Sequence, residues 1–191
     1  MNFIETRPEA SVTAGFLVPD EATSLFHALL AHVQWDERMK ARKTDCFGQT
    51  YDDSGVEYQV VPMHPLLVPL CDDIERQVGF RPTNCLLNYY TSGRSTMGFH
   101  SDATYNLADG TGIAIVSLGA QRNLTFRSKV DQSLLVHLPL PHRSLVYMTQ
   151  ITQDYWTHAV KKTNTDDARI SLTFRHIITP EELTRRDQAY S

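Results

Sequence analysis

A histidine and an aspartate stand two residues apart at the end of a strand-like stretch that runs from residue 84 to 102. On extended chain, residues two apart point to the same side, so His100 and Asp102 can both reach one metal ion and leave its opposite face open. With 8 histidines and 22 acidic residues in 191 positions, about one such pair is expected by chance. The alternative is a surface loop in which the histidine is only hydrogen-bonded. Further candidate ligands are needed to decide between a metal site and such a loop.

A third candidate ligand, His158, follows Trp156 and Thr157 in a short strand-like stretch. A lone histidine beside aromatic residues is more often part of a core. Together with His100 and Asp102, however, it completes the set of two histidines and one carboxylate that binds Fe(II) at three adjacent coordination positions. Such a site leaves three positions for a chelating cosubstrate and oxygen. The set therefore predicts an iron site.

The seven residues from Arg169 to Arg175 alternate strictly between polar and apolar side chains, so as a strand the segment has one polar face. That face carries Arg169, Ser171, Thr173 and Arg175. On an outer strand, this polar face would be exposed to solvent. Inside a barrel, the two guanidinium groups would need anionic partners. A small dicarboxylate would satisfy both, because the planar fork of arginine suits carboxylate oxygens.

A second strand, expected at 84 to 91, supplies further polar groups. It places Leu86, Asn88 and Tyr90 on one face. Asn88 and Tyr90 could donate hydrogen bonds to the same dicarboxylate.

Short strands separated by glycine and proline breaks must position these residues, and their spacing is typical of an all-β sandwich or barrel. We expect eight strands, at 84 to 91, 97 to 101, 112 to 118, 122 to 128, 133 to 138, 143 to 149, 156 to 160 and 168 to 178. Eight strands suggest a jelly roll, the double-stranded β-helix. Apolar residues at helical spacing predict helices at 20 to 34 and 65 to 78. The expected fold class is mainly β (α+β), with these helices as buttresses on one face of the barrel.

The length predicts one domain over residues 1–191, with a helical, lid-forming N-terminal extension at 1–80 and a jelly-roll core at 81–178. The stretch from 36 to 55 is polar and irregular, which predicts a loop. Its basic residues fit either a solvated loop or a rim that contacts phosphates. They are Arg38, Lys40, Arg42 and Lys43.

The composition limits the class of protein. A net charge of −4 argues against a tight, nonspecific duplex binder, although a local patch could still contact nucleic acid. The 3 cysteines lack close spacing, so neither a disulfide framework nor a structural zinc site is indicated, and a reducing cytoplasm is expected. We see neither a signal peptide nor a membrane span, and no signal for an obligate protein partner.

Several motifs, in this order, resemble the AlkB-like branch of the Fe(II)/2-oxoglutarate-dependent dioxygenases over roughly residues 45 to 178. They are Asn88-Tyr89-Tyr90 with Gly93, His100-Ser101-Asp102, Ile115 to Gly119 with Arg122 to Arg127, Trp156-Thr157-His158, and Arg169 to Arg175. The resemblance implies a double-stranded β-helix that uses Fe(II), 2-oxoglutarate and O2. It implies oxidative demethylation of alkylated nucleobases in DNA or RNA, with release of formaldehyde.

The resemblance also assigns roles to residues. His100, Asp102 and His158 match the iron ligands, Arg169 the arginine at the distal carboxylate of 2-oxoglutarate, and Arg175 the arginine near its chelating end. Asn88, Tyr90 and Thr173 match positions that line the cosubstrate pocket, and Ser171 stands in that pocket where a polar residue, often Asn, is usual. Part of the lid that closes over the substrate is matched by Phe47, Gly48 and Tyr51.

One position departs from the family pattern. Many repair members have an acidic residue within two positions of the iron-binding aspartate, where this chain has Ala103 and Thr104. The hydroxyl of Thr104 could accept a hydrogen bond from a base, and Tyr105 is a further candidate contact. The departure keeps a second hypothesis open, an oxygenase for a small metabolite, a free nucleotide or a protein side chain. A noncatalytic jelly-roll binding module is the third.

Overall fold

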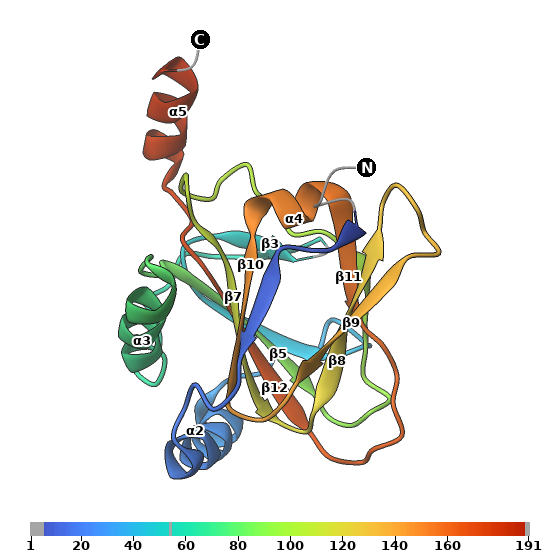
Figure 1. Ribbon diagram of the computed structural model, residues 1–191. Helices are drawn as coiled ribbons and strands as arrows, with labels where there is room; N and C mark the ends of the chain where they lie inside the picture. Colours follow the sequence, from blue (N-terminus) through green and yellow to red (C-terminus); the bar gives the residue numbers. More distant parts are fainter. Residues whose placement is uncertain (1–5, 54, 190–191) are drawn as a thin grey trace.

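Two antiparallel β-sheets dominate the computed structural model, which describes residues 6–53 and 55–189 (Figure 1). The larger sheet has the strand order β1-β10-β7-β12-β5-β2. Its strands are β1 (Ala10–Thr13), β2 (Lys43–Gly48), β5 (Asn84–Tyr90), β7 (Gly112–Gly119), β10 (Ser144–Thr149) and β12 (Arg169–Arg175). The last strand of the chain, β12, therefore lies inside this sheet, between β7 and β5.

The smaller sheet has the order β6-β11-β8-β9. Its strands are β6 (Met97–His100), β8 (Arg122–Ser128), β9 (Leu135–Leu140) and β11 (Trp156–Val160). A separate hairpin is formed by β3 (Tyr51–Asp53) and β4 (Val56–Tyr58).

All eight strands expected from the sequence are present, and they form the four inner strands of the larger sheet together with the whole smaller sheet. The prediction of a mainly β jelly roll is confirmed. The strand expected at 133 to 138 is β9, which begins two residues later at Leu135.

The prediction of an irregular loop from 36 to 55 was wrong, because β2 and β3 lie within it. In β2 the buried side chains are those of Thr44 and Cys46. The segment therefore lacks the regular alternation of polar and apolar residues by which a strand is recognised in a sequence. The division of the chain into an N-terminal extension up to residue 80 and a core after it stays a prediction. Strands β1 and β2, from the predicted extension, pair with β10 and β5 of the predicted core.

Two helices cover the outer face of the larger sheet, as Figure 1 shows, which confirms the expected buttresses. Helix α2 (Pro19–His32) begins at a proline followed by Asp20 and Glu21, which favour a helix N-terminus. Helix α3 (Val68–Val78) ends at Gly79, whose φ of 84° is left-handed and suits glycine.

Two short helices were not expected from the sequence. Helix α4 (Gln150–Tyr155) joins β10 to β11, and α5 (Pro180–Ala189) projects away from the sheets (Figure 1). None of the helices in the described residues is long and apolar enough to cross a membrane.

The apolar core has two parts. The first lies between the larger sheet and helices α2 and α3, and it contains Ile170, Leu172 and Phe174 from one face of β12. The second lies between the two sheets and includes Phe126 and Trp156. The opposite face of β12 is polar and buried, so its side chains are directed between the sheets.

Candidate functional site

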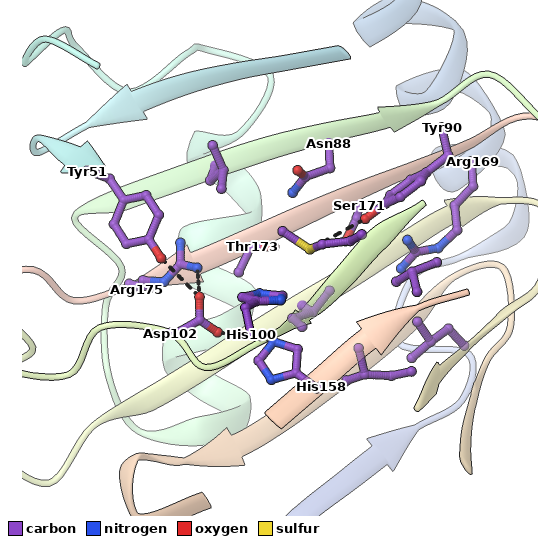
Figure 2. A pocket seen from close by; sticks show the side chains of 16 residues that line it. Tyr51, Asn88, Tyr90, His100, Asp102, His158, Arg169, Ser171, Thr173 and Arg175 are labelled. Atoms are coloured by element: carbon purple, nitrogen blue, oxygen red, sulfur yellow. Dashed lines mark hydrogen bonds and ion pairs between the residues drawn. The ribbon is translucent and has the colours of Figure 1, made fainter. Parts of the chain in front are cut away.

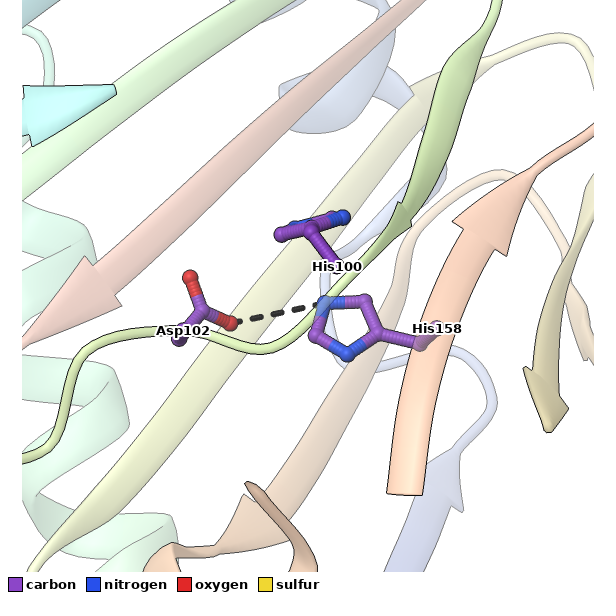
Figure 3. Close-up of side chains that lie close together, drawn as sticks. All are labelled: His100, Asp102 and His158. Atoms are coloured by element: carbon purple, nitrogen blue, oxygen red, sulfur yellow. Dashed lines mark ion pairs between the residues drawn. The ribbon is translucent and has the colours of Figure 1, made fainter. Parts of the chain in front are cut away.

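The three predicted iron ligands come together between the sheets (Figure 3). His100 ends β6, and His158 lies directly opposite it on β11, with 4.3 Å between the ring centroids. Asp102 follows on the connection after β6. The potential ligand atoms of all three residues lie within 4.8 Å of one another. The Nδ1 atom of His100 is 2.9 Å from the carbonyl oxygen of Gly98, which leaves Nε2 for a metal ion.

The two carboxylate oxygens of Asp102 have different surroundings. Tyr51 donates a hydrogen bond of 3.0 Å to Oδ1, and Arg175 forms an ion pair with the same oxygen (Figure 2). The other oxygen, Oδ2, lies 3.4 Å from Nε2 of His158. Because Oδ1 is already engaged by two donors, Oδ2 is the oxygen that can bind a metal ion.

Burial and charge set the protonation of these ligands. Burial alone would raise the pKa of Asp102, but Arg175, followed by His158 and His100, holds that pKa below its ordinary value. Burial lowers the pKa of His158 to about 4, against the opposing effect of Asp102. The carboxylate is therefore ionised and His158 neutral at physiological pH, which are the forms that bind metal.

The wall beside the triad is built by β12 and β5. These strands pair in the register Arg169↔Tyr90, Ser171↔Asn88 and Thr173↔Leu86. The pocket in Figure 2 is lined by the polar face of β12 together with the predicted face of β5. The residues are Arg169, Ser171, Thr173, Arg175, Leu86, Asn88 and Tyr90. The alternative of a wet outer strand is excluded, because every residue of β12 is buried.

Arg169 is a buried cation beside which the described residues place no carboxylate within ion-pair distance. Its Nη2 atom donates a 2.9 Å hydrogen bond to Ser117, and its guanidinium lies 5.3 Å from the ring centroid of Tyr90. Burial lowers its pKa to about 10. The Nε and Nη1 atoms of Arg169 are buried without a hydrogen-bond partner in the described residues, as are those of Arg175.

These unpaired donors show that the pocket suits a ligand with two carboxylates. A buried guanidinium group without an acceptor is costly, and a carboxylate is the group that best matches it. The three ligands beside it are the set that holds Fe(II) with open positions. The residues therefore fit iron together with 2-oxoglutarate.

Two groups that support the pocket were not recognised in the sequence. Arg42 is buried, and its Nε donates a 2.6 Å hydrogen bond to Oδ1 of Asn88. Since this bond occupies the amide oxygen, the group that Asn88 can offer a carboxylate is its NH2. Gln153, on α4, accepts a 2.9 Å hydrogen bond from the backbone N–H of Asp102. The sequence carried no signal for the first group, because the alternating burial of Arg42, Thr44 and Cys46 is seen only in the structure.

The other basic residues of this segment lie at the surface. Arg38 pairs with Asp36, and Lys43 pairs with Glu37. Lys40 is exposed. Both interpretations of the segment remain open for these three, whereas Arg42 is directed into the protein.

Of the five candidate substrate residues, Tyr51 alone lines the pocket. Phe47 packs toward the helices, 5.1 Å from the ring centroid of His64. Gly48 has a φ of 89°, and a Cβ atom there would lie 2.0 Å from the carbonyl oxygen of Thr83, so the turn requires glycine. Thr104 lies on the loop after Asp102, and the side chain of Tyr105 is 68% exposed. A substrate contact by any of the five stays a prediction.

Comparison with known proteins agrees with this geometry. Residues 9–175 match the family model of the 2OG-Fe(II) oxygenase superfamily, and the chain belongs to that superfamily. Within it, the chain is an AlkB homologue. It is 32% identical over 173 residues to DNA oxidative demethylase ALKBH2 of Homo sapiens, a match that covers 83% of this chain and 66% of that protein.

Two further relatives support the assignment. The chain is 31% identical over 183 residues to the alpha-ketoglutarate-dependent dioxygenase alkB homolog 3 of Bos taurus, which covers 85% of this chain and 64% of the relative. This chain thus spans somewhat less than two thirds of the length of these relatives. The solved structure of OsALKBH1 superposes with a TM-score of 0.61 at 15% identity, covering 88% of this chain and 98% of that one, and shares the fold.

Proposed function

We propose that this protein carries out Fe(II)- and 2-oxoglutarate-dependent oxidative demethylation of alkylated nucleobases in DNA or RNA. The observation that carries the proposal is the pairing of the triad with two buried arginines in one pocket. The similarity to a protein named as a DNA oxidative demethylase supports the substrate class.

Each part of the pocket has a task in this reaction. When bound, iron and 2-oxoglutarate supply the oxidation of a substrate C–H bond by O2, coupled to conversion of 2-oxoglutarate to succinate and carbon dioxide. His100, Asp102 and His158 would hold the iron. Arg169 and Arg175, at opposite ends of the polar face of β12, would hold the two carboxylates. The apolar wall, which includes Ile115 and Leu124, limits access of water.

The substrate imposes one further step. A methyl group on a base nitrogen becomes a hydroxymethyl group, which leaves as formaldehyde. A base in a duplex must first be extruded from the stack to reach the pocket. The reaction therefore predicts faster turnover on single strands than on duplex DNA.

The test uses oligonucleotides that carry 1-methyladenine or 3-methylcytosine, single- and double-stranded, with ferrous iron and 2-oxoglutarate. Loss of one methyl mass, with formation of an equal amount of formaldehyde, is the expected result. The matched control is Asp102→Ala. Succinate release without any loss of methyl from either base would contradict the substrate while leaving the class of enzyme intact.

The loop after Asp102 favours a second candidate, oxidation of a small metabolite, a free nucleotide or a protein side chain. Ala103 is exposed, and neither it nor Thr104 offers the carboxylate that would bind the amino group of a methylated base. Methylated free nucleosides, assayed beside the oligonucleotides, separate the two. Turnover of the nucleoside alone would favour the second.

We also infer that the protein acts in a reducing compartment such as the cytoplasm. Cys46, Cys71 and Cys85 are buried thiols that form no disulfide. Fractionation of cells that express the tagged chain tests the compartment.

A further inference from the structure

The backbone N–H of Asp102 lies just beyond the last residue of β6. The ladder between β6 and β11 ends at His100, so the next two residues have no strand partner for their backbone groups. Asp102 is nevertheless buried. A buried N–H without an acceptor is costly, and Oε1 of Gln153 fills this role at 2.9 Å.

Gln153 is itself held at two further points. The side chain is 3% exposed, and its Nε2 donates to Sδ of Met148 at 3.1 Å. Its backbone oxygen accepts a 2.6 Å hydrogen bond from Nζ of Lys129. The side-chain amide is thereby oriented, because the contact with sulfur takes the NH2 group and leaves the oxygen toward Asp102.

The same region contains a second link between the two ligand-bearing segments. Ser101 donates a 3.0 Å hydrogen bond to the carbonyl oxygen of Trp156. Helix α4 carries Gln153 and leads directly into β11, which carries His158. The segment 100–102 is thus attached to the segment 153–158 by the strand pairing at the histidines, by Ser101 and by Gln153.

We propose that Gln153 is a positioning residue for the iron site. It fixes the main chain of Asp102, whereas Tyr51 and Arg175 act on the carboxylate itself. With the main chain fixed, Oδ2 stays 3.4 Å from Nε2 of His158, so both atoms are ready for one ion. Gln153 would thereby preorganise the site without touching the metal.

The test measures metal affinity and needs no nucleic acid, so it can fail independently of the proposed substrate. Gln153→Met keeps the length of the side chain but lacks a comparable acceptor. We expect its affinity for Mn(II), measured by calorimetry, to fall about tenfold, as is typical when a group that supports a metal ligand is lost. The visible charge-transfer band of the complex with Fe(II) and 2-oxoglutarate should weaken in parallel.

Two matched variants separate positioning from packing. Gln153→Glu keeps an acceptor oxygen at the same length, and we expect it to bind Mn(II) more tightly than Gln153→Met does. Met148→Leu removes the sulfur contact but leaves Oε1 in place, and we expect it to retain most of the affinity. Thermal unfolding of the metal-free variants measures the stability of the fold in each case.

The proposal is overturned if Gln153→Met lowers the melting temperature but leaves the Mn(II) affinity unchanged, because the residue would then serve packing alone. It is also overturned if Gln153→Glu binds Mn(II) as weakly as Gln153→Met. Should Gln153→Met fail to fold, Ser101→Ala removes the neighbouring link. Ser101→Ala should weaken Mn(II) binding by a smaller factor, and unchanged affinity would again count against the positioning role.

Discussion

The two ends of β12 hold the same side chain in different electrostatic surroundings. At one end, Arg175 is buried in an ion pair with Asp102, and its guanidinium lies 4.0 Å from the ring centroid of Tyr51. At the other end, Arg169 is just as buried, but its partners are the hydroxyl of Ser117 and the ring of Tyr90. Although burial opposes both charges, Asp102 raises the pKa of Arg175, whereas the pKa of Arg169 falls.

This difference gives the two arginines different tasks. Arg175 is neutralised within the protein, so it belongs to the structure of the metal site. Arg169 carries a charge that the described protein groups leave uncompensated, and a ligand carboxylate would compensate it. The charge is therefore balanced at the iron end, which we call the complete end, and unbalanced at the far end, the incomplete end, while Nε and Nη1 of Arg175 stay available to a ligand carboxylate. A dicarboxylate that bridges the two ends would place one carboxylate beside Arg175 and compensate the charge of Arg169 with the other.

The largest effect is expected from Asp102→Ala, which removes the carboxylate from the complete end. Iron binding should be lost, because only the two histidines remain as ligands. Arg175 would be left buried without its anion, at a cost of about 3–5 kcal/mol in the free energy of unfolding. Calorimetry with Mn(II), succinate release and urea unfolding measure the three outcomes. Unchanged metal binding, in a protein that releases no succinate, would refute the assignment as an enzyme.

The second effect tests the incomplete end. Arg169→Met removes a cation that has no acidic partner, so the stability of the metal-free protein should change little or rise. The affinity for 2-oxoglutarate should fall by about 2–5 kcal/mol, the usual loss when a buried charge partner is removed. Titration of 2-oxoglutarate into the Mn(II) protein measures the loss.

The matched variant is Arg175→Met, which should destabilise the metal-free protein by about 3–5 kcal/mol because Asp102 loses its partner. Equal losses of stability from the two substitutions would remove the distinction between the ends.

A smaller effect is expected from Tyr51→Phe, which removes one donor from Oδ1 of Asp102 while Arg175 remains. A hydrogen bond to a charged group contributes about 1.5–3 kcal/mol, and part of this should appear as weaker Mn(II) binding. Tyr155→Phe is the control, because it removes the same hydroxyl group from a tyrosine on α4 that does not line the pocket. If both variants bind Mn(II) equally well, the hydroxyl of Tyr51 has no part in the metal site.

The smallest effect concerns Lys40, which is exposed in the segment before β2. Lys40→Gln should lower the slope of log affinity against log salt by about 0.9 for a bound oligonucleotide duplex, if this rim contacts a phosphate, which is one of the two interpretations of the segment. Arg81→Gln makes the same change of charge beside α3, where Arg81 pairs with Asp72, and should leave the slope unchanged. Equal slopes for Lys40→Gln and the unaltered protein would assign Lys40 to a solvated loop.

The sequence predicted which residues of β12 and of the triad meet in the pocket, because the signals for them are local. Strict alternation from Arg169 to Arg175 implies one polar face, whose burial was one of two alternatives, and the spacing of His100 and Asp102 implies a shared ligand direction. His158 was then added because it completes the set of two histidines and one carboxylate, and the family resemblance supported it. Eight of the ten strands in the two sheets followed from short runs between turn residues.

Contacts made by long side chains or by backbone atoms could not be predicted in this way. Arg42 looked like one of four surface cations, yet its side chain reaches inward to Asn88. Gln153 binds a backbone N–H, which leaves no pattern in residue types. Helix α4 has six residues, too few to show helical periodicity. The partner of each group depends on the tertiary fold.

The position of β12 has a consequence for how the chain is made. Both neighbours, β5 and β7, precede it in sequence, so each has an unpaired edge facing the gap until residue 175 has left the ribosome. At about 5–20 residues per second, this open state lasts for seconds. The two edges, with their unpaired backbone N–H and C=O groups, are templates for aggregation. The strand that closes the sheet also brings both arginines, so a nascent chain gains its cosubstrate pocket in the same step that removes its exposed edges.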